Sequence, residues 1–431
     1  MRCLSFRWSV SAMGLAITAL AGCAGTQTLT GAPAGGAQGR SVERLATQQP
    51  ITHLIVVVQQ DRSFDDLFSG YPGADAPRFG CASSIGWDVA GSKFAESGCP
   101  PGDSRVPLKA VRLAARPCAL SSSFADYFSI AWDHAKMDGW NRLDPKAPLC
   151  PYSRVTTRDT RTYWSLAKRF ALADHAFAST RFGFFPNQLY LVAGTTQIAP
   201  SAWVVGESPG AHMGCDSPPG TQTTVLSNGK IEPDGPFPCF TQFRTMANLF
   251  DKAGISWKYY SDPTGFDPFD AIRHVFEGRD RKRDLVTPAT QLLTDIAQHN
   301  LAAVSWVLSP YADSDAPGTR GGPRWVDAVV RAVQKSSYWS ASAVVVVWDN
   351  EGNGQHYDDV APPQLDDAGL GFRVPMIVIS PYAKRHYVSH TQYEFGSLLK
   401  FIEENWSLPP LGGYATDQRA NSVADMFDFG R

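Results

Sequence analysis

The sequence predicts an α/β fold, an α/β/α sandwich around a mostly parallel central sheet with long disulfide-held loops. Short unbroken runs of apolar, β-branched residues recur along the chain, as expected of strands that are buried on both faces of a parallel sheet. Segments with apolar residues at three- and four-residue spacing lie between these runs. Strands that alternate with amphipathic helices in this way form doubly wound sheets covered by helices.

The individual elements follow from the same two patterns. The expected strands are residues 54–58, 255–260, 303–308, 343–348 and 374–379. The expected helices are residues 162–171, 243–253, 325–333 and 395–405, where Pro323 marks one start and Gly254 marks one end. Two segments rich in Gly, Pro and Ser, 70–107 and 200–238, are expected to be long loops that are functional or held by disulfides.

The N-terminal segment is predicted to direct export. Arg2 and Arg7 precede an apolar stretch at residues 10–20, and small residues follow, which is the layout of a secretory signal peptide over residues 1–22. The apolar stretch is too short to remain as a membrane-spanning helix. An exported protein of the bacterial cell envelope is therefore expected.

Residues 20–23 read Leu-Ala-Gly-Cys and resemble the lipobox of bacterial lipoproteins. The resemblance implies that Cys23 carries a lipid that anchors the protein to a membrane, with the outer membrane or the periplasmic face favoured; an ordinary secretory signal is the alternative. Residues 23–50 are rich in Gly, Ala, Thr, Gln and Ser and are expected to form the anchor and a flexible tether. The folded domain is expected over residues 51–431.

The cysteine content and the charge of the chain indicate its redox environment and the partners that it can bind. Besides Cys3 and Cys23 the chain has six cysteines, and an even number in an exported protein favours disulfides. Sequence order suggests the pairs Cys81–Cys99, Cys118–Cys150 and Cys215–Cys239. A zinc site is the alternative, but no close Cys-x-x-Cys pair supports it. The net charge of −2 is spread along the chain, and no basic stripe points to nucleic acid.

A collinear series of motifs runs through the expected domain. Residues 53–68 read His-Leu-Ile-Val-Val-Val-Gln-Gln-Asp-Arg-Ser-Phe-Asp-Asp-Leu-Phe. Further motifs occupy residues 136–139, 163–174, 186–187, 303–306, 321–325, 348–349 and 371–381. Together they resemble the phosphoesterase family that contains bacterial phospholipases C and acid phosphatases. The resemblance implies an alkaline-phosphatase-like fold and metal-assisted hydrolysis of a phosphate monoester or a phospholipid head group.

The resemblance also implies where a metal would bind. In the family, a Glu-Asn pair after the first strand and an acidic pair after a late strand hold the metal, because hard oxygen ligands gather a divalent cation. Here these positions are Gln60, Asp61, Asp349 and Asn350. Each pair keeps one acid and has one amide, so weaker metal binding is expected. In the alternative reading, these residues cap the strand ends without a metal.

The position of the family's nucleophile is altered as well. In the family, a Ser or Thr two residues before a proline attacks phosphorus, and this position is Phe184 in the present chain. Phenylalanine has no nucleophilic atom. A local shift of the alignment would make Ser179 or Thr180 the substitute, and direct attack by water is the other route.

Other residues complete the predicted site. His390, Arg62 and Asn187 are the remaining catalytic candidates, and Arg62 is expected to orient the turn after the first strand. Two histidines of the resembling family are replaced, by Ala316 and Asp359. Two other histidines are not expected to be catalytic. His356 is expected to be a solvated loop residue unless it replaces a lost imidazole. His175 is expected to cap backbone carbonyls at a helix end.

Two functions from different classes follow. The first is an active phosphoesterase of the cell envelope, with a divalent metal ion as cofactor. The second is a catalytically silent relative that binds a phosphorylated ligand or a protein partner. The second hypothesis rests on five altered positions at one inferred site: Gln60, Phe184, Ala316, Asn350 and Asp359.

Overall fold

The computed structural model describes residues 50–430, apart from residues 84–98, 119, 121–123, 207–212 and 264–265. The expected signal peptide, Cys23 and almost all of the tether lie outside the described residues. Within the described ranges, no helix has the length and apolar character needed to cross a membrane.

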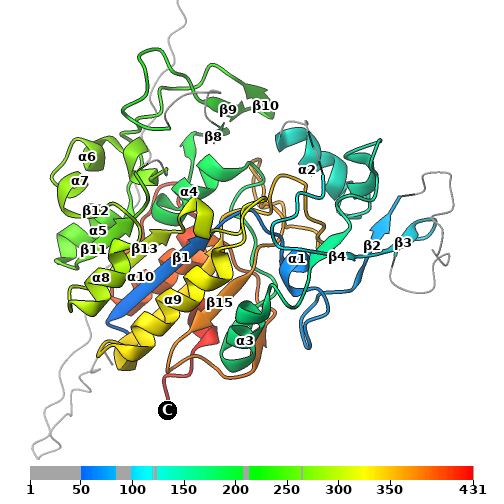
Figure 1. Ribbon diagram of the computed structural model, residues 1–431. Coiled ribbons are helices and arrows are strands. Elements are labelled where there is room, and N and C mark those ends of the chain that lie inside the picture. The colour runs from blue at the N-terminus through cyan, green and yellow to red at the C-terminus, as the bar shows by residue number, and fades with distance from the viewer. Residues whose placement is uncertain are drawn as a thin grey trace, which may run out of the picture. The chain divides into compact units, whose positions relative to one another are not determined.

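An eight-stranded sheet forms the centre of the domain, in the order β12-β11-β13-β1-β14-β15-β6-β16 (Figure 1). Its strands are β1 (His53–Gln59), β6 (Ala171–Ala173), β11 (Trp257–Tyr260), β12 (Leu285–Val286), β13 (Val304–Leu308), β14 (Ser342–Trp348), β15 (Met376–Ile379) and β16 (Tyr387–Ser389). All five expected strands form. Only β15 runs antiparallel to its two neighbours in this sheet, β14 and β6. The prediction of a mostly parallel sheet is therefore confirmed, although the direction of β15 was not foreseen.

Helices cover the sheet in two groups. In one group α9 (Gly322–Lys335) contacts α3 (Arg161–Arg169) and α8 (Gln291–Ala297), and in the other α4 (Phe184–Ala193) contacts α5 (Met246–Ala253) and α10 (Phe395–Asn405). The expected helices correspond to α3, α5, α9 and α10. The remaining helices are short: α1 (Phe64–Phe68), α2 (Phe124–Trp132), α6 (Arg273–Phe276) and α7 (Asp280–Arg283).

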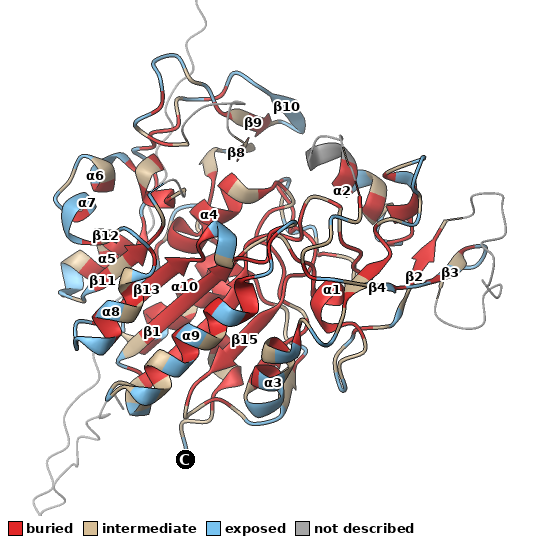
Figure 2. Cartoon of the chain, in the orientation of Figure 1, coloured by how far each residue is buried: buried red, intermediate tan, exposed pale blue. Residues whose placement is uncertain are grey.

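The core lies between the sheet and these helices. The apolar residues of β1 and β14 are fully buried, as Figure 2 shows for the central strands. Helix α9 turns Val326, Val329, Val330 and Val333 inward, because residues three and four apart share one face of a helix. Burial of this apolar stripe provides the main favourable free energy for docking the helix on the sheet.

The two long segments expected to be loops contain short strands. β2 (Phe79–Ala82) pairs with β3 (Ser104–Pro107), and β7 (Gln197–Ala199), β8 (Ala202–Gly206), β9 (Thr224–Ser227) and β10 (Lys230–Glu232) form a second sheet. A further pair joins β4 (Lys109–Val111) to β5 (Ser153–Val155). Strands of three to five residues are too short to show a period in a Gly- and Pro-rich sequence, so these strands were not predicted, whereas the expectation that disulfides hold the two segments is confirmed.

Three disulfides hold these outer segments. They join Cys81 to Cys99, Cys118 to Cys150 and Cys215 to Cys239. The pairing by sequence order is confirmed, and the zinc alternative is excluded because all six thiols are consumed. Each bond closes a segment with little core of its own, and removing the flexibility of such a segment in the unfolded chain stabilises the fold.

A buried pair of acids lies beside α10. The backbone N–H of Leu411 donates to Glu403 Oε1 at 3.0 Å and to Asp417 Oδ2 at 3.1 Å. Burial first, and then the charge of Asp417, raises the pKa of Glu403 from 4.5 to about 8.

This raised pKa predicts a defined loss of stability with pH. A group whose pKa is higher in the folded state contributes stability below its unfolded pKa, and that contribution is lost as pH rises through the folded value. Glu403→Gln keeps the acceptor for Leu411, so its free energy of unfolding should fall less than that of the wild type between about pH 5 and about pH 9. Urea denaturation over this range measures the difference, with exposed Glu404→Gln as the control. Parallel curves for wild type and Glu403→Gln would show that the group does not titrate as described.

Candidate active site

The ends of β1 and β14 form the candidate site. The two strands pair in parallel with Gln59 opposite Trp348, so the residues that follow them lie side by side. Asp61 has a positive φ of 60°, and its backbone N–H donates to Asp349 Oδ1 at 3.3 Å. The structure thus brings together the two acids that the sequence placed at this edge.

Asn350 directs the nitrogen of its amide, and not the oxygen, toward Asp349. Its Nδ2 donates to Asp349 Oδ1 at 2.9 Å and its side chain also bonds the Asp61 carboxylate, whereas its Oδ1 accepts from the backbone N–H of Gly352 at 2.7 Å. Its predicted role as an oxygen ligand therefore does not match the structure. Gln60 is half-buried at the end of β1, at the same edge.

Gln188 belongs to the site and was not predicted from the sequence. Its Nε2 donates to Asp349 Oδ2 at 3.0 Å, and its Oε1 accepts from the Tyr259 hydroxyl at 3.3 Å. The available signal was its spacing, because Gln188 lies four residues after Phe184 and so on the same face of α4. Both oxygens of Asp349 are thereby held by N–H donors.

The two carboxylates lie in a poorly solvated setting. Burial, followed by the charge of Asp61, raises the pKa of Asp349 well above its ordinary value. Burial also raises the pKa of Asp61, against the hydrogen bond from Asn350 and the charge of Arg62. Two buried carboxylates of this kind suit a divalent cation, which prefers hard oxygen ligands and offsets both charges. Asp61 and Asp349 fit such an ion, whereas Asn350 as oriented does not.

Phe184, which the sequence resemblance places at the nucleophile position, begins helix α4. Its ring lies 5.7 Å from that of Phe266, and the ring of Phe185 lies 5.2 Å from the same partner. The two hydroxyls considered as substitutes contact backbone instead: Ser179 Oγ accepts from Phe395 N at 2.8 Å and Thr180 Oγ1 from Phe182 N at 3.4 Å.

Asn187 supports the turn before α4. Its Oδ1 accepts from Thr180 N at 3.1 Å, and its Nδ2 donates to the carbonyls of Phe182 at 3.1 Å and Gly183 at 2.9 Å. All of these bonds are internal to the turn. Asn187 is therefore a positioning residue for Phe184 and Gln188, and the prediction that it is catalytic finds no support in these contacts.

Arg62 is buried and holds the turn after β1 in place. Its Nε donates to the Asp315 carbonyl at 2.7 Å and its Nη1 to Asp66 Oδ2 at 2.9 Å. His356 lies in the same cluster, with Nε2 3.3 Å from Arg62 Nη1, and is fully buried. The expectation of a solvated His356 was wrong, because the loop after β14 folds it inward. Arg62 orients the turn, as the sequence suggested, and does not reach solvent.

Asp359, which the resemblance places at a histidine position of the family, forms an ion pair with an arginine. Buried Arg373 contacts three carboxylates, those of Asp65 at 3.4 Å, Asp358 at 2.7 Å and Asp359 at 2.6 Å. Burial raises the pKa of Asp358 to about 6 despite the arginine. The guanidinium occupies the centre of this acidic group, so the group has no need of a metal ion. Ala316, at the other altered histidine position, is also buried.

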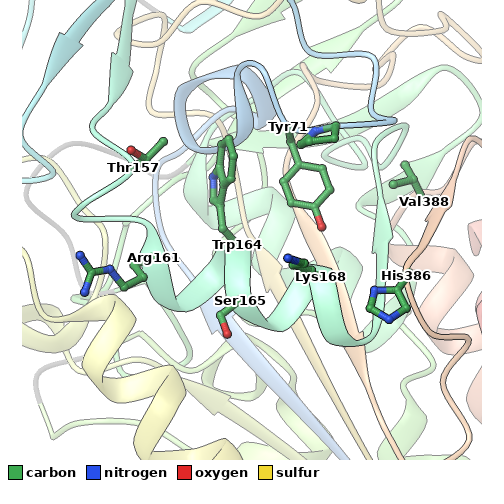
Figure 3. Close-up of a pocket in the computed structure, with 9 residues that line it drawn as sticks. Tyr71, Thr157, Arg161, Trp164, Ser165, Lys168, His386 and Val388 are labelled. Atoms are coloured by element: carbon green, nitrogen blue, oxygen red, sulfur yellow. The ribbon is translucent and has the colours of Figure 1, made fainter.

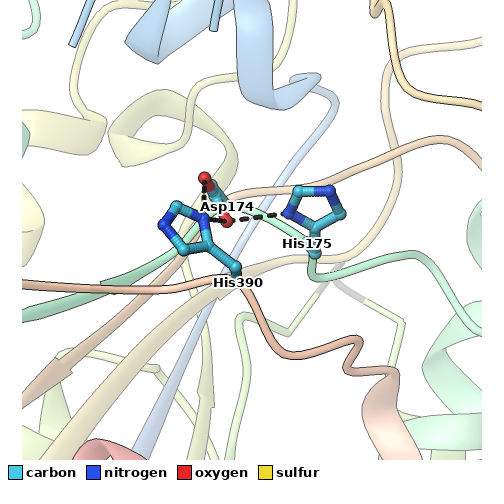
Figure 4. A group of neighbouring side chains, drawn as sticks. All are labelled: Asp174, His175 and His390. Atoms are coloured by element: carbon cyan, nitrogen blue, oxygen red, sulfur yellow. Dashed lines mark hydrogen bonds and ion pairs between the residues drawn. The ribbon is translucent and has the colours of Figure 1, made fainter. Parts of the chain in front are cut away.

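His390 lies away from the Asp61–Asp349 edge. It follows β16, which is three strands from β14, a separation of about 14 Å at the usual strand spacing. Its Nδ1 is 2.9 Å from Asp174 Oδ2, while His175 Nδ1 is 2.8 Å from Asp174 Oδ1 (Figure 4). The structure does not bring His390 to the predicted site, and His175 bonds a carboxylate rather than the backbone carbonyls expected of it.

A cavity of about 590 Å³ lies against α3 and β16, also apart from the two acids. The rings of Tyr71 and Trp164 line it together with the basic side chains of Arg161, Lys168 and His386 (Figure 3). Neither Asp61 nor Asp349 lines this cavity. A substrate at the Asp61–Asp349 edge would therefore bind elsewhere.

Comparison of the sequence with known proteins finds phospholipases C and an acid phosphatase among its relatives. Phospholipase C B of Mycobacterium tuberculosis is 25% identical over 87% of this chain and 77% of its own length. Non-hemolytic phospholipase C of Pseudomonas aeruginosa is 25% identical over 83% of this chain and 54% of its own length. A phosphate-repressible acid phosphatase of Penicillium chrysogenum is 24% identical over 39% of this chain and 43% of its own length.

Among solved structures, the murine ectonucleotide pyrophosphatase / phosphodiesterase 5 is 8% identical, with a TM-score of 0.38 over 62% of this chain and 94% of its own. We draw no conclusion about function from a TM-score of 0.38. The profile of the Phosphoesterase family, by contrast, matches residues 51–409, which is most of the chain and includes both strand ends of the candidate site. This chain belongs to the Phosphoesterase family.

Proposed function

We propose that this protein hydrolyses phosphate ester bonds, as a phospholipase C or an acid phosphatase does, with the help of a divalent metal ion and on an alkaline-phosphatase-like fold. The observation that carries this proposal is the convergence of half-buried Asp61 and buried Asp349 at the ends of β1 and β14. The substrate class is a phosphate monoester or a phospholipid head group, in keeping with the names of the relatives.

Asp61 and Asp349 would hold the cation. When bound, a divalent cation stabilises negative charge on the phosphoryl oxygens. Gln188 and Asn350 hold the Asp349 carboxylate in place through N–H donors. Phe184 offers no attacking atom, so a water oxygen forms the new bond to phosphorus and loses a proton, while the bond to the alcohol oxygen breaks and that oxygen takes up a proton, so that one water is consumed.

Export and membrane attachment form part of the proposal. Residues 1–22 have the layout of a signal peptide and Cys23 that of a lipidated cysteine. Three disulfides within the domain suit an oxidising compartment outside the cytosol. We place the enzyme at the cell envelope, where phospholipids and phosphate esters are both accessible.

A catalytically silent binding protein is the second candidate. Two points favour it: the resemblance assigns the nucleophile position to Phe184, and the Asn350 amide directs its nitrogen to Asp349. Such a protein would hold a phosphorylated ligand at the same edge without turnover. Activity measurements separate the two candidates.

The hydrolase proposal predicts metal-dependent turnover. The full chain should hydrolyse an aryl phosphate or an aryl phosphocholine when Mg²⁺, Ca²⁺, Mn²⁺ or Zn²⁺ is added. Asp349→Asn should lower kcat by about 100-fold or more, since it removes half of the carboxylate charge at the site. Exposed Asp367→Asn is the matched control and should retain activity. No turnover with any metal, together with no metal in the protein by elemental analysis, would leave only the silent candidate.

A second prediction tests the position of Phe184. In a background of Gln60→Glu, Asp61→Asn and Asn350→Asp, which restores the family pattern, Phe184→Ser should be about tenfold or more faster than Phe184→Ala, because only serine supplies a nucleophile. Activity on the aryl phosphate and trapping of a phosphorylated serine provide the measurements. Equal rates in two folded variants would contradict the assignment of residue 184 to the nucleophile position.

A further inference from the structure

A second group of potential metal ligands lies at the edge formed by β6 and β16. These strands pair in parallel with Ala173 opposite Ser389, so the residues that follow them, Asp174 and His390, come together although 216 positions separate them in the sequence. His175, directly after Asp174, contributes another imidazole. The pairing of two short strands thus places three side chains at one point (Figure 4).

The donor atoms have a geometry close to that of a metal site. Asp174 Oδ1 lies 2.8 Å from His175 Nδ1 and Asp174 Oδ2 lies 2.9 Å from His390 Nδ1. All three donor atoms lie within 4.8 Å of one another. Two imidazole nitrogens and one carboxylate oxygen form a donor set typical of zinc sites.

Asp75 provides the outer support that metal-binding histidines usually have. Its Oδ2 lies 3.9 Å from His175 Nε2, and its backbone N–H donates to Asp174 Oδ2 at 2.8 Å. When Nδ1 of a neutral imidazole binds a metal, Nε2 carries the proton and faces the Asp75 carboxylate, which lies at ion-pair rather than hydrogen-bond distance. Arg373 Nη1 donates to the carbonyls of Asp75 at 2.7 Å and Asp174 at 3.0 Å, so one buried guanidinium holds both segments.

Burial and charge distinguish this group from the other clusters of acids and histidines that the described residues form. The group of Asp65, Asp358 and Asp359 surrounds Arg373, and the group of Asp251, Asp280 and Asp284 surrounds Arg283. At Asp174 the carboxylate is fully buried, whereas 61% of the His390 side chain is exposed. Asp174 therefore forms the buried inner side of the group, and His390 forms the side that solvent can reach.

We propose that Asp174, His175 and His390 form a second divalent-metal site, of the kind that binds zinc, separate from the Asp61–Asp349 edge. A cation here joins the ends of β6 and β16 and, through Asp75, the loop after α1. Its coordination is completed by water or a small anion on the exposed side, since three protein ligands leave a position open. This site does not depend on the proposed catalysis.

Zinc binding to the full chain tests the proposal. Metal-free protein is titrated with Zn²⁺ against a chromophoric chelator; wild type should bind one equivalent at this second site, besides any bound by Asp61 and Asp349, and Asp349→Asn should retain it. His175→Ala and His390→Ala should each weaken this binding by about 100-fold, and Asp75→Asn by about tenfold. His386→Ala, an exposed histidine beside β16, is the control and should bind as wild type. Unchanged affinity in both histidine variants, or loss of the equivalent in Asp349→Asn, would overturn the proposal.

A second measurement protects the test against variants that fail to fold. Anomalous diffraction at the zinc edge from wild-type crystals grown with Zn²⁺ should place a peak in contact with the Nδ1 atoms of His175 and His390 and with the Asp174 carboxylate. A peak confined to Asp61 and Asp349, or no peak, would refute the site whatever the variants do.

Discussion

The parallel pairing of β1 with β14 is the constraint on which the site depends. From Leu54 to Val58, and along the whole of β14, the strands are buried on both faces, so neither strand can shift without exposing apolar residues or burying polar ones. A slip of one residue would reverse the faces of all the side chains on a strand and would separate Asp61 from Asp349. The hydrophobic core therefore positions the chemistry: two acids that would repel each other are held together because the strands before them cannot move apart.

The neighbourhood of Asp349 shows how the chain accommodates its departures from the family. Asn350 and Gln188 surround the Asp349 carboxylate with N–H donors, which favour its charged form, although burial still raises the pKa of Asp349 well above its ordinary value. Arg62 adds positive charge close to Asp61, but its N–H groups donate to Asp66 and to a backbone carbonyl. Two neighbouring carboxylates still favour a positive charge between them, which is the physical basis for proposing a cation.

The sequence predicted correctly those features that depend on long apolar runs or on the order of parallel strands in the sheet. The five expected strands had unbroken apolar runs, and the Asp61–Asp349 contact followed because both residues come directly after parallel strands. It failed where structure depends on distant partners. The three-residue strands β6 and β16 have no readable period, the direction of β15 is set by the connection that precedes it, and His356 is buried only because its loop folds over Arg62. Gln188 and the Asp174–His390 pair required knowledge of which helix face and which strand ends meet.

The most direct test of the central claim is a crystal structure of the full chain grown with Mn²⁺ and inorganic phosphate, with the metal located by anomalous scattering. The account predicts a manganese peak in contact with the carboxylates of both Asp61 and Asp349, and a phosphate bound to that ion close to the first turn of α4. A well-ordered structure with phosphate bound away from this edge, and without manganese on either aspartate, would contradict it.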